Sequence, residues 1–213
     1  MASDFYQTDR AVAEYLLLHY GSAKQVLPYS FGPHDALGFP VRCITECLEP
    51  ERLPPGARAL EIGCAVGRST FELVRYCAQA VGIDRSPPFI ATARYLQQHG
   101  SINFACPEEG TLTVPATAFV PADLDRNLAI FVEADAEELP GELGGFDVVL
   151  MANLIDRLRD PMRCLGRLPH LVKAGGQLII TSPYTWLEEY TPMDHWLGGY
   201  QLDGKRVTTL GTL

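Results

Sequence analysis

Three groups of polar residues follow apolar runs that are typical of buried strands. The glycine turn 63–67 comes at the end of the run 58–63, Asp84 ends the run 79–84, and Asp135 follows the run 130–134. A glycine turn lets a ligand approach the backbone closely, and the helix that starts there offers free N–H groups. A carboxylate at a strand end can accept hydrogen bonds from a ribose diol. These residues predict a nucleotide pocket; an ordinary strand-to-helix turn and a helix-capping aspartate are the structural alternatives.

The spacing of the glycines distinguishes two kinds of nucleotide. Dinucleotide enzymes carry G-x-G-x-x-G, with an acid about 20 residues further on. Here Gly63 and Gly67 flank Ala65, and the third dinucleotide glycine is absent. The pattern Glu61-x-Gly63-x-Ala65-x-Gly67 resembles the E/D-x-G-x-G-x-G loop of class I methyltransferases, with alanine in the middle glycine's place. An NAD-dependent oxidoreductase remains the less favoured alternative.

This resemblance implies S-adenosylmethionine as the cofactor and S-adenosylhomocysteine as its product. In class I methyltransferases an acid at the place of Asp135 commonly bonds the adenine amino group, and the next backbone N–H, here that of Ala136, meets the ring. The cofactor-binding residues implied in this way are Glu61, Gly63, Cys64, Ala65, Gly67, Asp84, Arg85, Asp135, Ala136 and Asn153.

The elements that would position these residues alternate along the chain. Strands are predicted over 58–63, 79–84, 130–134, 146–151 and 177–181, and helices over 67–78, 87–99 and 160–172. This alternation predicts a Rossmann-like α/β fold, with a mostly parallel sheet and helices on both faces. We expect a single domain, 1–213. Its first part, 1–55, is predicted to be a helical lid with helices over 9–20 and 39–48, and the core is predicted over 56–213.

Two segments depart from the alternation. Prolines and glycines punctuate residues 101–128, which predicts an inserted β-like hairpin. The chain ends soon after the strand 177–181, where class I methyltransferases continue with an antiparallel hairpin, and only Val207 to Leu210 could begin one. We therefore expect this final hairpin to be missing or truncated, with an open sheet edge.

Composition narrows the class of partner. The net charge is −9 and no cluster of lysine and arginine is visible, which argues against nucleic acid and favours a small-molecule substrate. No apolar run is long enough for a membrane span, and the N-terminus lacks a secretory signal pattern. The six cysteines form no C-x-x-C and have no histidine pair at zinc spacing. We expect reduced thiols, no metal and a cytoplasmic protein.

Two more segments at strand ends carry polar and aromatic side chains. Asn153, Asp156 and Arg157 follow the run 146–151, without the N-P-P-Y of DNA amino-methylating enzymes. The segment 181–192 concentrates aromatic residues and carboxylates. Aromatic rings can surround a sulfonium, and carboxylates can bind an amino group or take a proton. A surface ion pair at Asp156 and Arg157, and a packed loop over 181–192, are the structural alternatives.

Several strings spread over nearly the whole chain resemble the C-terminal methyltransferase domain of ovothiol synthases. They are Tyr6-Gln7-Thr8-Asp9, Glu14-Tyr15-Leu16-Leu17-Leu18-His19-Tyr20-Gly21, Phe39-Pro40-Val41-Arg42-Cys43, Gly63-Cys64-Ala65-Val66-Gly67-Arg68-Ser69 and Ser182-Pro183-Tyr184-Thr185-Trp186-Leu187-Glu188-Glu189. The resemblance implies methylation of an imidazole nitrogen of 5-thiohistidine (mercaptohistidine), giving ovothiol. In fused relatives an iron-dependent sulfoxide synthase precedes this domain; here we expect it to be a separate partner.

Such a transfer needs a neutral nitrogen lone pair held about 3–3.5 Å from the methyl carbon, and no metal. A cation such as Arg42 or Arg157 could bind the acceptor's carboxylate, and Glu188 or Glu189 its ammonium. The predicted catalytic residues are Asn153, Tyr184 and Glu188, and the predicted substrate-binding residues are Tyr6, Tyr15, His19, Arg42, Arg157, Trp186 and Glu189. Methylation of another small nucleophile, and a non-catalytic cofactor-binding module, remain alternatives.

Overall fold

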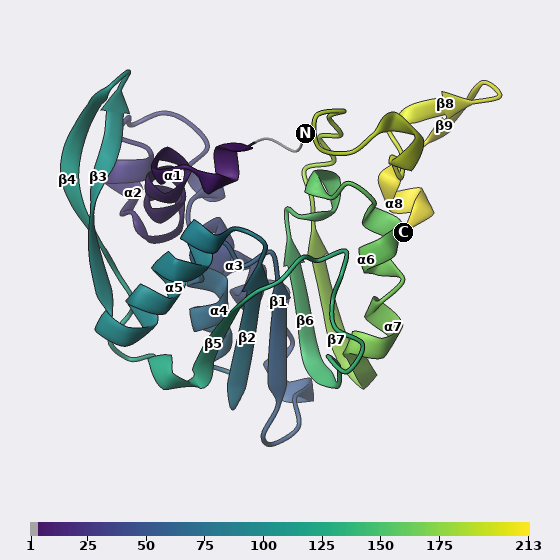
Figure 1. Ribbon diagram of the computed structural model, residues 1–213, viewed down its shortest axis with the longest axis horizontal. Coiled ribbons are helices and arrows are strands. Elements are labelled where there is room, and N and C mark those ends of the chain that lie inside the picture. The colour runs from purple at the N-terminus through teal and green to yellow at the C-terminus, as the bar shows by residue number, and fades with distance from the viewer. Residues whose placement is uncertain (1–3) are drawn as a thin grey trace.

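A five-stranded parallel sheet forms the centre of the computed structural model, which describes residues 4–213 (Figure 1). Its strands are β1 (Arg58–Ile62), β2 (Gln79–Asp84), β5 (Ala129–Glu133), β6 (Phe146–Ala152) and β7 (Val172–Thr181), in the order β5-β2-β1-β6-β7. This confirms the Rossmann-like α/β fold. The strand order reverses between β1 and β6, and ligands of open α/β sheets bind at the carboxyl ends of strands at such a point.

Helices cover both faces of the sheet because successive strand residues point to opposite sides. Ala59, Val148 and Leu150 enter one core, together with buried side chains of α3 (Phe39–Thr45), α4 (Arg68–Leu73) and α5 (Pro87–His99). Leu60 and Val149 enter the other core, with α6 (Pro161–Leu165) and α7 (Leu168–Leu171).

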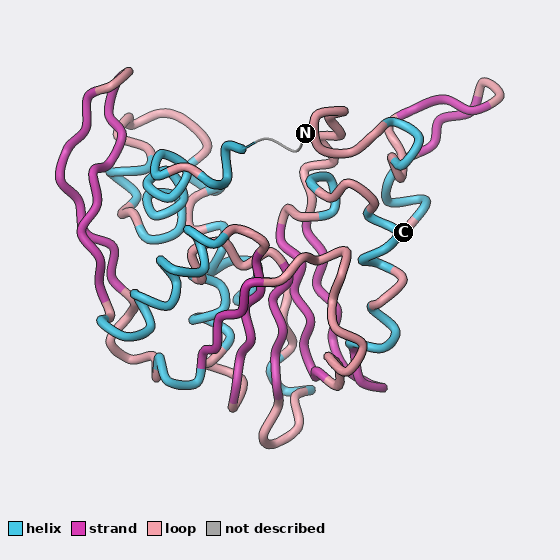
Figure 2. Tube along the Cα trace, in the orientation of Figure 1, coloured by secondary structure: helices cyan, strands magenta, loops and turns pink. Residues whose placement is uncertain are grey.

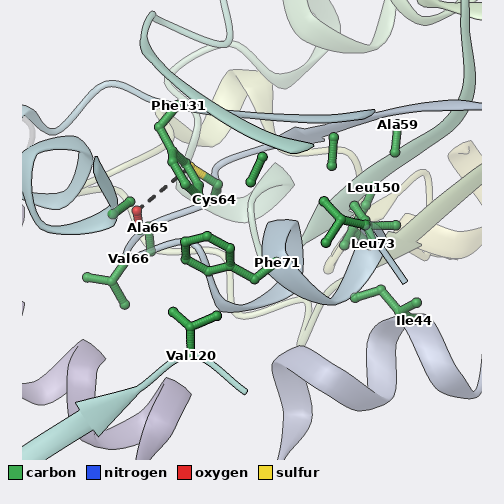
Figure 3. Close-up of a cluster of buried hydrophobic side chains, with 14 of the residues drawn as sticks. Ile44, Ala59, Cys64, Ala65, Val66, Phe71, Leu73, Val120, Phe131 and Leu150 are labelled. Atoms are coloured by element: carbon green, nitrogen blue, oxygen red, sulfur yellow. Dashed lines mark hydrogen bonds between the residues drawn. The ribbon is translucent and has the colours of Figure 1, made fainter. Parts of the chain in front are cut away.

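The first core lies directly beneath the glycine turn (Figure 3). The rings of Phe71 and Phe131 meet edge to face there, with centroids 5.1 Å apart. Cys64 and Val66 are fully buried in the same cluster, so the side chains of the turn are part of the core. The turn is therefore held by packing from below, which leaves its backbone to face the end of the sheet.

The N-terminal region is helical, as expected. It contains η1 (Asp4–Gln7), α1 (Asp9–Tyr20), α2 (Ala23–Val26), η2 (His34–Ala36), α3 and η3 (Pro50–Arg52); residues 1–3 of the expected lid lie outside the described residues. Thr8 caps α1 by accepting from the backbone N–H of Ala11 at 3.1 Å. At its other end, the Tyr20 hydroxyl donates to the backbone oxygen of Val66 at 2.9 Å, which ties α1 to the glycine turn.

The inserted hairpin expected near 101–128 is confirmed. β3 (Ser101–Glu109) and β4 (Leu112–Phe119) pair only with each other, antiparallel, and η4 (Arg126–Leu128) leads back into β5. The hairpin packs against α1 at the edge of the molecule, beyond the helices on that face (Figure 1). It therefore supports the N-terminal helices without extending the main sheet.

Two expected helices are shorter in the structure. The helix expected over 67–78 ends as α4 at Leu73, because the next residues form a tighter turn in which Tyr76 donates to Leu73 at 3.1 Å. The helix expected over 160–172 is divided into α6 and α7. Pro169 lacks an N–H and cannot continue a helix, but it fits the first turn of a new one, α7. The strand expected from 177 begins at Val172, with a register shift near Gly175, whose φ is +80°.

The C-terminal segment differs from expectation. η6 (Met193–His195) is followed by β8 (Tyr200–Leu202) and β9 (Lys205–Val207), which pair with each other, and by α8 (Thr209–Thr212). Residues 207–210, which could have begun the final hairpin, instead end β9 and begin α8, where the Thr208 side chain caps the helical turn. Within residues 4–213 no strand pairs with the outer side of β7. None of the helices in this part of the chain has the length and apolarity to cross a membrane.

Candidate active site

The glycine loop, residues 63–67, runs from the end of β1 to the start of α4. Gly63, Ala65 and Gly67 all have positive φ angles, +80°, +47° and +84°. A Cβ at Gly67 would lie 2.6 Å from the ring of Phe131, so only glycine fits there. The N–H groups of Gly63 and Cys64 both donate to the backbone oxygen of Ile83, at 2.8 and 2.9 Å. Strand β2 therefore fixes the first turn of the loop.

Ala65 occupies a left-handed conformation that costs an L-residue with a side chain about 1 kcal/mol or more. We expect Ala65→Gly to raise the free energy of unfolding by about 1 kcal/mol, because glycine adopts this φ without strain. Urea denaturation would measure the change. Ala59→Gly, in strand β1, is the matched control and should lower the free energy of unfolding; a decrease in both variants would show that Ala65 is not strained.

Asp84 lies at the end of β2, beside the glycine loop. Its Oδ2 accepts from the backbone N–H of Ala65 and its Oδ1 from that of Ser86, both at 2.9 Å. Burial raises the pKa of the Asp84 carboxyl, and the two backbone hydrogen bonds oppose that shift. Each carboxylate oxygen has a further lone pair, so the group is oriented by the backbone and can still accept hydrogen bonds from a ligand.

A cavity of about 300 Å³ opens at the carboxyl ends of β1, β2, β5 and β6, and we call it the central cavity. Loop segments collect at this end of the sheet, between the N-terminal helices and the C-terminal segment (Figure 2). The predicted site residues that line the cavity are Tyr6, Tyr15, His19, Glu61, Gly63, Ala65, Asp84, Arg85, Asp135, Ala136, Asn153 and Arg157. The structure thus brings together four strand ends, the glycine loop and the N-terminal helices.

Glu61 is the most deeply buried acid of the cavity wall, with 2% of its surface exposed. One carboxyl oxygen accepts from the hydroxyl of Thr70 at 2.5 Å. Burial raises the pKa of Glu61 to about 8, and the hydrogen bond from Thr70 reduces the shift. In the ligand-free protein the Glu61 carboxyl is therefore largely protonated at neutral pH.

This raised pKa predicts a dependence of stability on pH. The folded protein keeps the Glu61 proton between about pH 4.5 and 8, where the unfolded chain has lost it, so this carboxyl's contribution to stability falls as pH rises through that range. We expect Glu61→Gln to flatten the fall in the free energy of unfolding between pH 6 and 8, measured by denaturant titration. Glu188→Gln, at an exposed site, should leave the slope unchanged; an unchanged slope in Glu61→Gln would contradict the prediction.

Aromatic side chains of the N-terminal segment form one wall of the cavity. The ring of Tyr15 lies 4.7 Å from that of Phe89 and 5.6 Å from that of His19, between centroids. The backbone oxygen of Tyr6 accepts from the Ser86 hydroxyl at 2.6 Å, so the segment docks beside Asp84. Within residues 4–213 the buried Nδ1 of His19 has no hydrogen-bond partner. Burial lowers the pKa of His19 to about 3, so its ring is neutral.

Arg157 lines the cavity, and its neighbour Asp156 lies behind it. Asp156 is fully buried, so the surface ion pair considered for these residues is not what the structure shows. Its carboxylate accepts from Arg157 Nη1 at 2.9 Å and from the N–H and hydroxyl of Thr185 at 3.1 and 2.9 Å. The Ser182 hydroxyl donates to it at 3.2 Å. One buried carboxylate therefore holds both the cationic side chain and the loop that follows β7.

Some predicted residues lie outside the central cavity. Arg42 pairs with Glu46 at 2.6 Å on the outside of α3. Trp186 is buried elsewhere, where its Nε1 donates to Thr209 at 2.8 Å. Tyr184, at φ +53°, is 44% exposed. Two predicted cofactor residues, Cys64 and Gly67, do not line the cavity either. The Cys64 side chain is in the core, and Gly67 is the N-cap of α4.

Glu188 and Glu189 line a second, more polar hollow. It adjoins the central cavity because both share Arg85 and Asp135. Tyr190 lines this hollow as well and was not among the predicted site residues, although it follows Glu189 directly in an aromatic segment. Phe89, which lines the cavity, was also missed. It is the third residue of α5, and no local pattern marks that position as facing a ligand.

Residues 60–180, more than half of the chain, match the model of a methyltransferase domain family. The chain belongs to this family. A ubiquinone biosynthesis O-methyltransferase of Methylococcus capsulatus is 30% identical over 135 residues, covering 63% of this chain and 47% of that relative. The corresponding protein of Pseudomonas aeruginosa is 29% identical over 127 residues, covering 60% and 44%. The chain thus spans about half the length of the curated relatives that it matches.

A solved structure from Galdieria sulphuraria, assigned as a sarcosine dimethylglycine methyltransferase, shares the fold of this methyltransferase. Its TM-score is 0.50 at 15% sequence identity, and the match covers 68% of this chain and 45% of that chain. The family uses S-adenosylmethionine as cofactor, so the enzyme is an S-adenosylmethionine-dependent methyltransferase. This confirms the cofactor and the reaction class expected from the glycine loop.

The central cavity fits this cofactor in its donors, acceptors and charge. At Gly63 a Cβ would lie 3.0 Å from the Leu154 side chain, and φ is +80°, so glycine suits this position of the loop. If the cofactor binds as the glycine loop implies, Asp84 would accept from its ribose diol and Asp135 from its adenine amino group. Glu61, a buried carboxyl without an ion pair among residues 4–213, would face its methionine end. When bound, the cofactor supplies a methyl group carried on a sulfonium.

Proposed function

We propose that this methyltransferase acts on an imidazole nitrogen of 5-thiohistidine, the methylation that gives ovothiol. One observation carries the proposal: the strings that resemble the ovothiol synthase domain meet around one cavity. Tyr6, Tyr15 and His19 belong to the two N-terminal strings, and all three line the central cavity. Gly63 and Ala65 belong to the string of the glycine loop and line it as well. These positions are spread along the chain, and sequence pattern alone does not require them to meet.

The cavity wall suits transfer to a neutral ring nitrogen. Tyr15, Phe89 and Tyr6 form an aromatic wall that excludes water from the attacking atom. His19 is neutral at physiological pH because burial lowers its pKa to about 3, so it places no positive charge next to the acceptor or the sulfonium. A neutral imidazole nitrogen already carries the lone pair that attacks, so no protein base is required before transfer.

The charged residues of the site can orient an amino-acid acceptor. Arg157 at the cavity wall is proposed to bind the acceptor's carboxylate, and Glu188 or Glu189 in the adjoining hollow its ammonium. Asn153 lines the cavity at φ +52°, a conformation that its neighbours must hold, and is proposed to orient the reacting groups. An iron-dependent sulfoxide synthase is proposed as the activity that makes the thiohistidine.

Methylation of a phenolic oxygen is the second candidate, because the curated relatives are O-methyltransferases. A phenol must lose its proton during transfer, which calls for a general base near pH 7. The lowered pKa of His19, to about 3, makes it a poor base for this step. A neutral imidazole therefore matches the cavity better than a phenol does.

Mass spectrometry of reactions with S-adenosylmethionine tests the proposal. The acceptors are 5-thiohistidine, histidine and catechol, each in separate reactions, and Asp84→Ala provides a control impaired in cofactor binding. We expect a methylated product from 5-thiohistidine alone. A product from catechol alone would favour the second candidate, and no product from any acceptor, with cofactor binding intact, would overturn the thiohistidine proposal.

A further inference from the structure

Three tyrosines from distant parts of the chain meet at the mouth of the central cavity. The ring centroid of Tyr6 lies 6.2 Å from that of Tyr15 and 6.1 Å from that of Tyr190. Both Tyr15 and Tyr190 influence the pKa of the Tyr6 hydroxyl, as expected for neighbouring phenols. We call these three residues the phenol triad. They join η1 and α1 to the segment that follows β7, so both halves of the chain contribute to one surface.

Arg157 completes this surface. Its guanidinium carbon lies 4.9 Å above the ring of Tyr190, a cation–π contact. Its hydrogen bonds within residues 4–213 all come from Nη1 and Nη2, to Asp156 and Thr185. A guanidinium has five N–H donors, and the edge formed by Nε and Nη2 can bind a carboxylate with two parallel hydrogen bonds. Nη1 is held by Asp156 and Thr185, and Nη2 gives one N–H to Thr185. Among residues 4–213 this leaves the Nε N–H and the second N–H of Nη2 for a ligand.

The triad offers donors rather than negative charge. Burial raises the pKa of both Tyr6 and Tyr15, so their phenols remain protonated at physiological pH. Asp156 pairs with Arg157 behind this surface. Of the other acids, Asp84 lies on the Tyr15 side, and Glu188 and Glu189 line the hollow that Tyr190 also lines. Aromatic faces, hydroxyl donors and one guanidinium edge together suit a flat ring that carries a carboxylate.

We propose that the phenol triad and Arg157 form the acceptor subsite for a planar aromatic ring bearing a carboxylate, and that Tyr190 is the positioning residue that holds Arg157 toward that carboxylate. The inference rests on the proposed function only in taking the acceptor to be a small aromatic molecule. It deepens that proposal by naming the acceptor's class, and it adds a residue that the sequence motifs do not mark.

A pair of probes tests this subsite independently of which natural acceptor the enzyme methylates. The probes are imidazole-4-propionate and its primary amide, which share a ring and differ in the negative charge. Their binding is measured by isothermal titration calorimetry with S-adenosylhomocysteine present. For the unmodified protein we expect the carboxylate to bind about tenfold more tightly than the amide. Equal affinities, or no binding of either probe, would overturn the subsite.

Variants then test the role of Tyr190. Tyr190→Leu should abolish the preference for the carboxylate, whereas Tyr190→Phe, which keeps the ring above Arg157, should retain most of it. Tyr95→Leu, on the exposed side of α5, is the matched control and should bind both probes as the unmodified protein does. Unchanged affinity for S-adenosylhomocysteine shows that the variants are folded.

The two proposals can fail separately. A carboxylate preference that survives in Tyr190→Leu would overturn the positioning role of Tyr190. The unmodified protein could fail to methylate 5-thiohistidine and still prefer the carboxylate probe, with that preference lost in Tyr190→Leu. That result would support the subsite and overturn only the natural acceptor proposed above.

Discussion

Replacing Asp84 with alanine is expected to weaken S-adenosylmethionine binding by about 100-fold or more. The carboxylate orients the glycine loop through the N–H of Ala65 and the start of α5 through that of Ser86, both at 2.9 Å. We also propose that it accepts from the ribose diol, and each hydrogen bond to a charged group contributes about 1.5–3 kcal/mol. Isothermal titration calorimetry of the purified variant measures the dissociation constant directly.

Two further variants make this result specific. Asp84→Asn keeps the shape and part of the accepting capacity, so its affinity should lie between those of the unmodified protein and Asp84→Ala. Asp194→Ala, in the exposed η6, should bind as the unmodified protein does. Equal affinity in Asp84→Ala and Asp194→Ala would exclude Asp84 from the cofactor site.

Replacing Asp156 with alanine is expected to lower the free energy of unfolding by about 3–5 kcal/mol, because it leaves the partly buried Arg157 without its ion-pair partner. The Asp156 side chain is 1% exposed and that of Arg157 is 25% exposed. The N–H of Thr185 and the hydroxyl of Ser182 lose their acceptor as well. Urea denaturation and the thermal midpoint should both show the loss.

Asp156→Asn distinguishes charge from hydrogen bonding. An amide can still accept from Thr185 but does not neutralise Arg157, so we expect a smaller loss of stability than in Asp156→Ala. Asp160→Ala, which removes only the cap of α6, is a control for the loss of a carboxylate nearby and should cost about 1 kcal/mol. A cost for Asp156→Ala no larger than this would show that the buried carboxylate does not hold the loop.

The sheet and its glycine loop were predictable because their signals are local. Apolar runs with glycine turns mark β1, β2, β5 and β6, and alternation with helices allows few topologies. The breaks in the helix after Gly67 and in that over 160–172 were missed, because tight turns and a proline that starts a new helix look like continuations of a helical pattern. The C-terminal helical turn after Val207 depends on a threonine cap and on packing against Trp186, which no periodicity shows.

The candidate site also has a part that the sequence predicts and a part that it does not. The predicted cofactor residues lie at strand ends, so motif and topology place them together. Arg42 and Trp186 were predicted from charge and aromaticity alone, and the structure uses them for a helix-surface ion pair and a buried contact. Tyr190 was missed because its role depends on a meeting with Tyr6 and Arg157 across the fold. Residue type indicates what a side chain can do, but only tertiary packing decides whether it faces the cavity.

The contacts that hold the N-terminal segment over the cavity join residues far apart in the chain. Tyr20 reaches Val66 across 46 residues, and Tyr6 reaches Ser86 across 80. Val66 and Ser86 follow β1 and β2, so we expect α1 to gain these contacts only after the two strands have paired. The amides of α1 should then exchange with deuterium faster than those of the central strands, as expected if the aromatic wall of the cavity opens without global unfolding.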